Sequence, residues 1–428
     1  MKRIAVIGAG YVGLTTAVCL AHLGNRVTGM DVDGERVERM RRGESPILEP
    51  GLEEMMRETL ADGRLSFTTD PAEAVGGADF VFLCVPTPQG PDGAADLRFV
   101  EEAAGQIAPH LKPGAIVVNK STVPVGSAGK VVAAIGRDDT AVVSNPEFLR
   151  EGSAVLDCLH PDRVVIGCED RAAGEELAAL YEPLGAPTLI TDPVSAETIK
   201  YACNAFLAAK VSFVNAIANL CSAVGADALD VIKGMGFDRR IGPDHLAPGP
   251  GWGGSCFPKD TSALIRMARD HGYDFALLRE AVAANEEQFD RVADQVSAAA
   301  GGLAGAVVAA WGLTFKAGTD DLRDSPALAV LRRLKRRGAT LRAYDPTHPD
   351  PSREPLRSLG VALYDDPYET CRGAHALVIL TEWPELACLD LGRVASIMAR
   401  PAVVDTRNLL DPAAARSAGL SYTGMGRS

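Results

Sequence analysis

The 428-residue sequence has no excess of basic residues, because Asp and Glu total 56, Lys and Arg total 43, and the net charge is −13. Non-specific binding to nucleic acid or to an anionic membrane needs a basic face. The composition therefore argues against both kinds of partner. It still allows a local basic pocket for an anionic small molecule.

Cysteine pairs and long apolar runs are also missing. The nine cysteines include no C-x-x-C pair and have long spacings, so we expect no metal site and no disulfide framework. No apolar run approaches the ~20 residues that span a bilayer. The apolar residues after Arg3 break at glycines, so we expect no signal peptide. Together these observations predict a cytoplasmic protein.

The length and the hydrophobic pattern predict an α/β protein with more than one core. Residues 1–195 alternate short apolar runs with helical patterns, which is typical of a parallel, doubly wound Rossmann-type sheet. Residues 196–298 carry little strand signal, and an apolar pattern of about 30 residues predicts one long buried helix. A Gly- and Pro-rich loop over 241–258 follows, and the helical pattern resumes at Thr261. Residues 299–428 predict a smaller Rossmann-like domain.

A glycine motif follows the first predicted strand: Gly8-Ala9-Gly10-Tyr11-Val12-Gly13 matches G-x-G-x-x-G. Its glycines permit a tight turn, a close approach to a pyrophosphate and close helix–strand packing. Asp31 ends the second predicted strand, where a carboxylate binds ribose hydroxyls and repels a 2′-phosphate. Arg36 could instead meet a phosphate. The motif predicts an NAD-binding domain over 1–195, with NAD favoured over NADP.

The sequence Gly253–Asp260, GGSCFPKD, places Cys256 in a glycine-rich segment beside Lys259 and Asp260. A nucleophilic cysteine needs partial exposure, a stabilised thiolate and a neighbouring acid–base group. This segment offers all three. By itself, however, a lone cysteine in a turn is better explained as a small hydrophobic residue.

Several sequence blocks together resemble the UDP-glucose/GDP-mannose dehydrogenase family nearly from end to end. The blocks are VIGAGYVGL, CVPTP with DGAADL, KSTVPVGS, NPEFLREGSAVLDCLHPDRVVIG, ETIKYACNAFLAAKVSFVNAIANLC, GGSCFPKD and GLTFKAGTDDLRDSP. The resemblance implies an NAD-dependent, four-electron oxidation of a nucleotide sugar at C6 to the uronic acid, with two NADH formed. UDP-glucose is the expected substrate, and dTDP-glucose and GDP-mannose are the alternatives.

The resemblance also assigns catalytic roles. It makes Cys256 the nucleophile that forms a thiohemiacetal and then a thioester. Lys200 and Asn204, one helical turn apart, match residues that stabilise an oxyanion. Asp260 matches a residue that positions or deprotonates water, and Glu147 matches a proposed general base for thioester hydrolysis. Thr122 matches a water-binding hydroxyl, and the division of roles between Glu147 and Asp260 stays open.

Binding roles follow from the same resemblance. The cofactor contacts it implies are Gly8, Gly10, Tyr11, Val12, Gly13, Asp31, Arg36, Thr87, Thr122, Glu151, Lys259 and Arg323. The substrate contacts it implies are Glu147, Phe148, Leu149, Arg150, Lys200, Asn204, Arg240, His245, Gly249, Pro250, Gly251, Gly253 and Lys316.

The resemblance further implies a homodimer, with residues 196–298 as the dimerisation segment and residues 299–428 as the sugar-nucleotide-binding domain. Arg240 matches an arginine that reaches the neighbouring subunit's substrate. His245 stands where the family often has an aromatic residue, which leaves the preference for the nucleotide base open. Ser255 stands where N-acetyl-mannosamine relatives typically carry histidine, which favours the glucose enzymes.

Two other functions remain open from the residues. One is a two-electron hydroxyacid dehydrogenase with a similar first domain, which would use helix lysine and asparagine residues but no thiol in this loop. The other is a catalytically silent NAD-binding regulatory or assembly protein. The set Cys256, Lys200, Asn204 and Asp260 argues against the silent protein.

Overall fold

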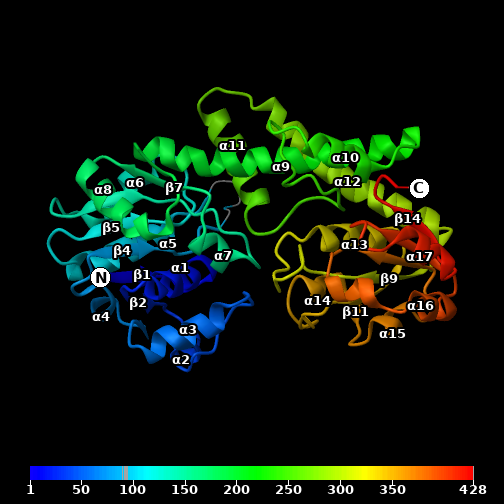
Figure 1. The fold of residues 1–428 in the computed structure, drawn as a ribbon, viewed down its shortest axis with the longest axis horizontal. Helices are drawn as coiled ribbons and strands as arrows, with labels where there is room; N and C mark the ends of the chain where they lie inside the picture. The colour runs from blue at the N-terminus through cyan, green and yellow to red at the C-terminus, as the bar shows by residue number, and fades with distance from the viewer. Residues whose placement is uncertain (89, 91–94, 428) are drawn as a thin grey trace. The chain divides into compact units, whose positions relative to one another are not determined.

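The computed structural model describes residues 1–88, 90 and 95–427. Residues 92–94 of the DGAADL block therefore lie outside the described residues. The chain divides into two compact units (Figure 1), Met1–Cys203 with Ser262–Met267, and Asn204–Thr261 with Ala268–Ser428. Each unit contains one β-sheet, so the two α/β parts expected from the sequence are present.

The first unit is organised around a sheet that has eight strands within the described residues, in the order β3-β2-β1-β4-β5-β6-β7-β8. The first six positions follow the Rossmann order. One junction differs from the expected parallel sheet, because β6 and β7 run antiparallel. The strands are β1 Arg3–Ile7, β2 Arg26–Met30, β3 Leu65–Thr68, β4 Phe80–Leu83, β5 Ile116–Asn119, β6 Ala141–Ser144, β7 Val164–Cys168 and β8 Thr188–Thr191.

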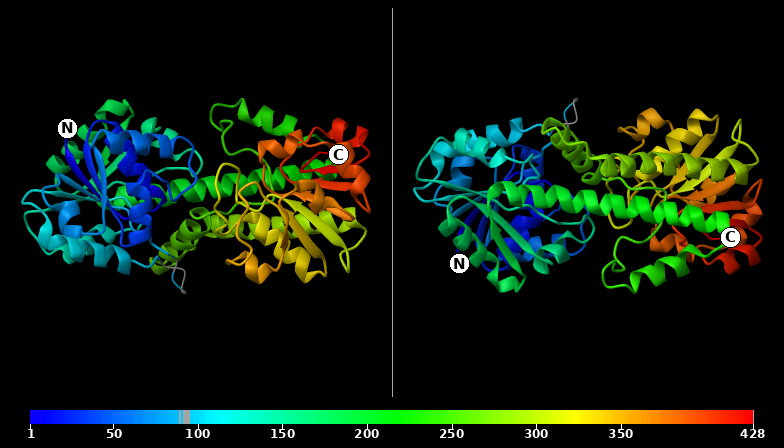
Figure 2. Two further views of the ribbon diagram at one scale, coloured as in Figure 1. Left: turned by 90° about the horizontal axis from the view of Figure 1, so that it is seen from below. Right: turned by 90° about the horizontal axis from the view of Figure 1, so that it is seen from above.

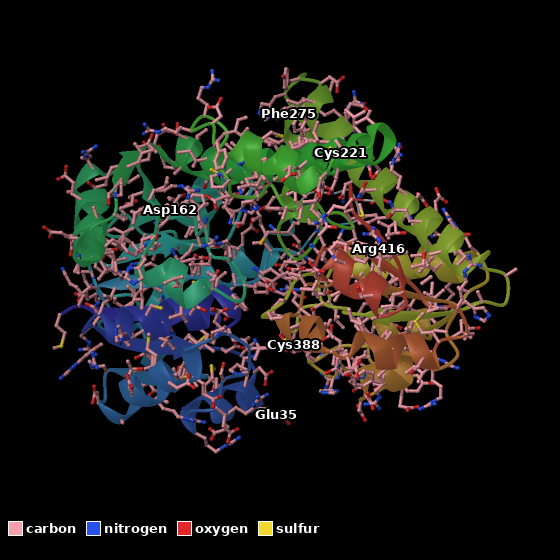
Figure 3. The ribbon with its side chains drawn as sticks, turned by 45° about the vertical axis from the view of Figure 1, so that its right-hand side comes forward. Glu35, Asp162, Cys221, Phe275, Cys388 and Arg416 are labelled. Carbon is pink, nitrogen blue, oxygen red and sulfur yellow. The ribbon has the colours of Figure 1, made fainter. Side chains whose placement is uncertain are left out.

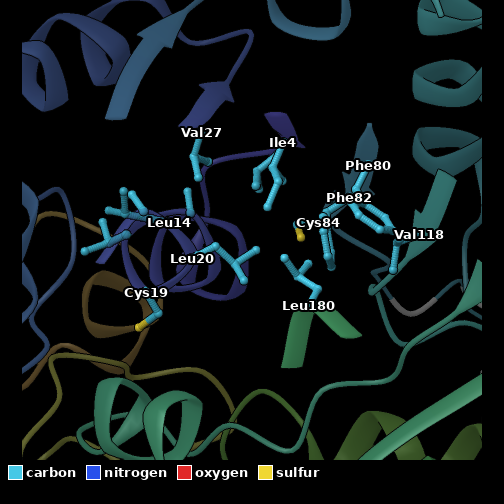
Figure 4. Packing of buried hydrophobic residues seen from close by; sticks show 14 of the residues in the cluster. Ile4, Leu14, Cys19, Leu20, Val27, Phe80, Phe82, Cys84, Val118 and Leu180 are labelled. Atoms are coloured by element: carbon cyan, nitrogen blue, oxygen red, sulfur yellow. The ribbon is translucent and has the colours of Figure 1, made fainter. Parts of the chain in front are cut away.

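Apolar side chains bury both faces of this sheet. On β1, Ile4 and Val6 join one core cluster, and Ala5 and Ile7 join another, because successive strand residues point to opposite faces. Figure 4 shows the first cluster, where Leu14 and Leu20 lie near Ile4 and Val27. The helices of this unit are α1 Tyr11–His22, α2 Gly34–Arg41, α3 Leu52–Ala61, α4 Pro71–Val75, α5 Arg98–Ile107, α6 Ser127–Ile135, α7 Ala154–Leu159 and α8 Arg171–Tyr181.

The middle of the chain is helical, as the sequence predicts. Its helices are α9 Pro193–Val224, α10 Ala228–Gly236, α11 Phe257–Asp270 and α12 Ala276–Ala300. Helix α11 begins four residues before the expected position at Thr261, so Pro258 lies in its first turn. Proline is tolerated there because a first-turn N–H has no partner within the helix. Cys256 is therefore the residue directly before a helix and not the middle of a loop.

Helix α9 is unbroken over 32 residues (Figure 2), which confirms the long helix but not its complete burial. Phe206, Phe213 and Leu220 are 68%, 57% and 56% exposed, and they recur every seven residues on one face. By length and composition this helix could cross a membrane, contrary to the expected absence of such a run, and 33% of its apolar window is buried. Core helices of soluble proteins meet the same criterion, so the finding is weak evidence for a membrane span.

The second unit contains a sheet that has six strands within the described residues, in the order β11-β10-β9-β12-β13-β14, with each described pair of neighbours parallel. This is again a Rossmann-like arrangement, which confirms the prediction. Its strands are β9 Val307–Trp311, β10 Thr340–Tyr344, β11 Ala362–Leu363, β12 Ala376–Ile379, β13 Ala402–Asp405 and β14 Ser421–Gly424. Its remaining helices are α13 Pro326–Arg336, α14 Leu356–Leu359, α15 Pro367–Cys371, α16 Leu391–Ile397 and α17 Pro412–Ser417.

Candidate active site

The glycine motif forms the turn between β1 and α1. Gly8 has φ of +93°, and a Cβ there would lie 2.7 Å from the carbonyl oxygen of Cys84. A Cβ on Gly13 would lie 1.8 Å from the carbonyl oxygen of Gly8, so Gly13 is required by the close approach of helix and strand. At Gly10, by contrast, an added Cβ meets no atom of the described residues within 4 Å. The space at Gly10 is open for a ligand.

Asp31 follows β2 and holds the turn in place. Its Oδ2 accepts a hydrogen bond of 2.8 Å from the N–H of Ala9, and its Oδ1 accepts one of 3.0 Å from the N–H of Asp33. The guanidinium of Arg36 lies 3.5 Å from Asp31 Oδ2. Arg36 is thus beside the carboxylate that would meet the ribose.

The turn fits a dinucleotide. The first turn of α1, Tyr11–Leu14, carries no acidic residue, and its free N–H groups favour an anion. Thr87 and Thr122, both expected at the cofactor, are joined because the Thr87 hydroxyl donates to the Thr122 carbonyl oxygen at 2.8 Å. The structure therefore brings these two distant loops together within the first unit.

Tyr11 is more than a spacer within the glycine motif. Its hydroxyl donates to a carboxylate oxygen of Glu49, and it accepts from the N–H of Gly152 at 2.7 Å. Glu49 is 6% exposed, so this carboxylate is buried. The contact ties the start of α1 to the segment that follows Glu151. Glu49 was missed from the sequence, where it lies outside every block.

Lys200 and Glu147 form an ion pair inside the first unit. Lys200 Nζ lies 2.8 Å from Glu147 Oε1, and the side chains are 4% and 6% exposed. Glu147 follows β6, and its Oε2 accepts from the N–H of Leu149 at 2.7 Å. Burial raises the pKa of Glu147, but Lys200, the Leu149 N–H and Lys120 outweigh it and leave that pKa below its usual value. Glu147 is therefore ionised at neutral pH.

The neighbouring residues of the NPEFLRE block differ from one another in exposure and in contacts. The Phe148 ring lies against two cations, with the Arg163 guanidinium 3.8 Å and Lys200 Nζ 5.6 Å from its centroid. Leu149 and Glu151 are partly buried, while Arg150 is exposed and pairs with Asp157 at 2.5 Å. The aromatic ring therefore helps to position the lysine.

A second buried lysine, Lys120, was missed from the sequence. It follows β5, it is 7% exposed, and its Nζ donates to Asn145 Oδ1 at 3.1 Å. Tyr181 also donates to that oxygen, at 2.7 Å. Burial lowers the pKa of Lys120, Glu147 opposes this shift, and Lys200 adds to it. A usable signal was the position of Lys120 and Asn145 after strands whose carboxyl ends hold ligands in open α/β sheets.

Cys256 and Asp260 belong to the second unit. The Asp260 N–H donates to the Cys256 carbonyl oxygen at 2.8 Å, which makes Cys256 the N-cap residue of α11. Cys256 is partly buried, and Ser255 Oγ lies 3.6 Å from its sulfur. The N-terminus of a helix stabilises negative charge, so this position suits a thiolate.

Asp260 is completely buried and has two side-chain partners in the second unit. Asn204 Nδ2 donates to Asp260 Oδ2 at 2.6 Å, and Lys259 Nζ donates to Oδ1 at 2.7 Å. Asn204 is one turn after Lys200 in α9, as expected from the sequence. The carboxylate of Asp260 is thus held by an amide and a cation on its two oxygens.

The loop over 249–253 is fixed by buried amides of the second unit. Asn215 Oδ1 accepts from the Gly249 N–H at 2.8 Å, and Gln288 Nε2 donates to the Gly249 carbonyl oxygen at 2.9 Å. A Cβ on Gly253 would lie 1.9 Å from the carbonyl oxygen of Asp324. Pro250 and Gly251 are buried. Gly253 is therefore required by the packing of this loop.

The other predicted site residues of the second unit lie in more open places. Arg240 is 90% exposed in its side chain and pairs with Asp238 at 2.6 Å. His245 is partly buried, with φ of +56° and its ring 6.4 Å from the Phe257 ring. Lys316 lies in the loop after β9, 5.6 Å from the Phe315 ring centroid.

Three further observations complete the site. Arg323 is exposed and pairs with Asp321 at 2.7 Å. Within the described residues, no three His, Cys, Asp or Glu side chains form a cluster that could hold a metal ion. None of the nine cysteines, each of them described, forms a disulfide.

Comparison with known proteins defines the class. The UDP-glucose/GDP-mannose dehydrogenase family matches in three parts: its NAD binding domain over residues 2–185, its central domain over 194–287 and its UDP binding domain over 309–412. The chain belongs to this family of NAD-dependent oxidoreductases, which confirms the resemblance seen in the sequence, the NAD cofactor and a nucleotide-sugar substrate.

Similarity to full-length relatives points to particular members of this family. The chain is 46% identical to UDP-glucose 6-dehydrogenase of Pseudomonas aeruginosa, over 99% of this chain and 97% of that protein. It is 45% identical to UDP-glucose 6-dehydrogenase of Rhizobium meliloti, over 99% of both. A solved UDP-glucose dehydrogenase of Pyrobaculum islandicum superposes with a TM-score of 0.92 at 40% identity, covering 100% of this chain and 98% of that one.

Proposed function

We propose that this protein oxidises UDP-glucose at C6 to UDP-glucuronate and forms two NADH from two NAD⁺. The relatives that carry this activity in their names cover the whole chain, which supports the substrate. The observation that carries the four-electron chemistry is Cys256 at the N-cap of α11, one turn before the buried Asp260. A dehydrogenase that stops at the aldehyde needs no thiol there.

The glycine turn, Asp31, Arg36, Thr87 and Thr122 would hold the dinucleotide, with Glu151, Lys259 and Arg323 as further contacts. Bound NAD⁺ supplies a hydride acceptor for each of the two oxidations. The open space at Gly10 and the acid-free first turn of α1 support a pyrophosphate at this position. The Asp31 carboxylate favours free ribose hydroxyls over a 2′-phosphate.

In this proposal, Cys256 makes the second oxidation, from aldehyde to acid, possible. An aldehyde carbon cannot release a second hydride until a nucleophile has added to it. The Cys256 thiolate adds to the aldehyde, and the resulting thiohemiacetal loses a hydride and its hydroxyl proton to become a thioester. Water then attacks the acyl carbon, the C–S bond breaks, and the carboxylate leaves while the thiolate is restored. Each turnover consumes one water and leaves Cys256 unchanged.

In this proposal, the buried polar and charged groups stabilise the oxyanions and orient the attacking water. Lys200 and Asn204 stabilise the negative oxygen of each tetrahedral species. Asp260, held at both oxygens by Asn204 and Lys259, orients the attacking water. Thr122 of the first unit is assigned a water-binding hydroxyl. Glu147 keeps Lys200 charged and fixed. The depressed pKa of Glu147 makes it a weaker base, which supports Asp260 as the residue that handles the water.

Substrate binding is assigned to both units separately. In the first unit the segment Phe148–Arg150 accompanies Glu147. In the second unit the loop over 249–253, with Lys316 and His245, meets the nucleotide sugar. The match of the family's UDP binding domain to residues 309–412 supports Lys316 near the diphosphate. The charge of Lys316 suits that role.

We also propose that two copies associate through α9 in the cytoplasm. The exposed stripe of Phe206, Phe213 and Leu220 is the apolar surface for that contact, because a heptad spacing aligns side chains along one face. Arg240, exposed and close in sequence to α10, would reach the substrate of the neighbouring copy. Nine cysteines without a disulfide suit a reducing compartment.

The test is the number of NADH formed per nucleotide sugar consumed, measured with UDP-, dTDP- and GDP-sugars. We expect about two with UDP-glucose and a matching amount of uronic acid, since each C6 oxidation releases one hydride. A ratio near one would favour the two-electron dehydrogenase. No NADH with any sugar would favour the silent NAD-binding protein.

A further inference from the structure

A small cavity lies in the first unit beside Lys200. Its lining includes Asn119, Thr122, Ser144, Glu197 and Lys200, and the space open to the centre of a water molecule is about 10 Å³. A cavity needs about 10–15 Å³ in this measure to hold one water. Six of the eight lining residues have polar side chains, so the cavity offers hydrogen-bond partners as well as room for a single water molecule.

Asn119 is the unusual member of this lining. Its side chain is 2% exposed, and neither the amide oxygen nor the amide nitrogen has a hydrogen-bond partner among the described residues. Each buried polar atom left unpaired costs about 1–3 kcal/mol. Native proteins rarely leave such groups unpaired, so an amide that lines a polar cavity indicates a bound partner.

The neighbouring strand shows the difference. Asn145 directly follows β6 and is equally buried, but its side chain is bonded on both sides. Its Oδ1 accepts from Lys120 and Tyr181, and its Nδ2 donates to the carbonyl oxygen of Val165 at 2.8 Å. Two equally buried asparagines at neighbouring strand ends therefore differ. Protein groups satisfy the hydrogen bonds of Asn145, whereas no described protein group bonds to the amide of Asn119.

The other polar walls already have defined roles. Glu197 accepts from the N–H groups of Gly126 and Ala128 at 2.6 and 3.1 Å, at the start of α6, and from Ser144 Oγ at 3.1 Å. Lys200 donates to Glu147. A water among these groups can donate to the Asn119 oxygen, accept from the Asn119 nitrogen and accept from the Lys200 ammonium, which gives it the usual 2–4 partners.

We propose that this cavity binds one water molecule held by the Asn119 amide, and that this water makes Asn119 a positioning residue for Lys200. The water supplies an acceptor to the ammonium, so it favours the charged lysine and fixes its direction. The kinetic part of the proposal rests on the proposed role of Lys200 in catalysis. The water site itself does not depend on any activity.

The direct test is a crystal structure of the full chain at a resolution that shows ordered water. We expect one water in the cavity within hydrogen-bond distance of both Asn119 amide atoms, and none in Asn119→Leu, which keeps the shape but removes both polar atoms. An empty cavity in the unaltered protein, or an Asn119 amide bonded to protein groups, would overturn the site. If the water is present but the protein oxidises no nucleotide sugar, the water site is confirmed and the proposed function is refuted.

The second test is the pH profile of kcat with UDP-glucose. Asn119→Leu should move the alkaline limb down by about half a pH unit, about threefold in the protonation ratio, because the ammonium loses an acceptor. Asn119→Asp should move the same limb up, because a carboxylate favours the charged lysine. Thr16→Val removes a different buried polar group of this unit, a hydroxyl with no hydrogen-bond partner among the described residues. This variant serves as the control and should leave the pH profile unchanged. If the alkaline limb of the kcat profile stays in place in both Asn119 variants, the positioning role is overturned.

Discussion

Lys200 Nζ lies 2.8 Å from Glu147 Oε1, and this buried pair joins α9 to the segment after β6, 53 residues earlier. Because both side chains are removed from water, each depends on the other for its charge. If either side chain were lost singly, the other would remain as one unpaired charge at the carboxyl end of the first sheet. The pair therefore connects the stability of the first unit to the chemistry proposed for Lys200.

Glu147→Gln should destabilise the protein by about 3–5 kcal/mol at neutral pH, since it leaves Lys200 without its carboxylate. The pKa of Glu147 is lowered in the folded state from its usual 4.5. Its contribution is therefore complete above that value and is lost as pH falls through the lower folded pKa. Urea unfolding at a series of pH values should show the difference between the two proteins shrink below pH ~4.5. A constant difference down to pH ~3 would contradict this account.

Cys256→Ser should reduce overall turnover with UDP-glucose by orders of magnitude while NAD⁺ and substrate still bind, because a hydroxyl is a poor nucleophile without strong activation. Steady-state NADH formation and binding calorimetry give the two measurements. The control is Cys388→Ser, at the exposed thiol labelled in Figure 3, which should keep full turnover. Undiminished turnover in Cys256→Ser would refute the thioester route.

Gly10→Ala and Gly13→Ala should fail in different ways although they lie three residues apart. The new Cβ at Gly13 would meet the Gly8 carbonyl oxygen at 1.8 Å, so that variant should lose stability. At Gly10 the Cβ has open space, so that variant should fold with an unchanged melting temperature and bind NAD⁺ more weakly. Thermal melts with NAD⁺ titration separate the two. Unweakened binding in Gly10→Ala would place the pyrophosphate elsewhere.

Phe213→Glu should dissociate the proposed dimer, because it puts a charge in the centre of the exposed stripe on α9. Light scattering after size exclusion reports the mass of each species. Tyr273→Glu places the same charge at a side chain that is 61% exposed and outside α9, and it should leave the mass unchanged. If the unaltered protein elutes as a monomer at micromolar concentration, the stripe has another purpose.

Much of the fold could be predicted because it depends on local pattern. The β1 residues Ile4 and Val6 point to one face and Ala5 and Ile7 to the other, so a continuous apolar run correctly indicated a strand buried on both sides. The exposure of Phe206 and Phe213, seven residues apart on one face of α9, could not be predicted. An apolar helix has the same sequence pattern whether its apolar face packs against the core or lies in solvent. The antiparallel pairing of β6 with β7 was missed for a similar reason, since strand direction leaves no mark on apolar spacing.

The sequence by itself determined the glycine turn, the nucleophile candidate and the helix carrying Lys200 and Asn204, because each depends on short spacings along the chain. Only the tertiary structure decided the partners: Glu147 for Lys200, Asn204 and Lys259 for Asp260, and the buried groups around Lys120 and Asn119. Except for Lys259 and Asp260, which are neighbours in the sequence, these pairs join segments more than 20 residues apart. Their charges and unpaired amides matter because they are buried.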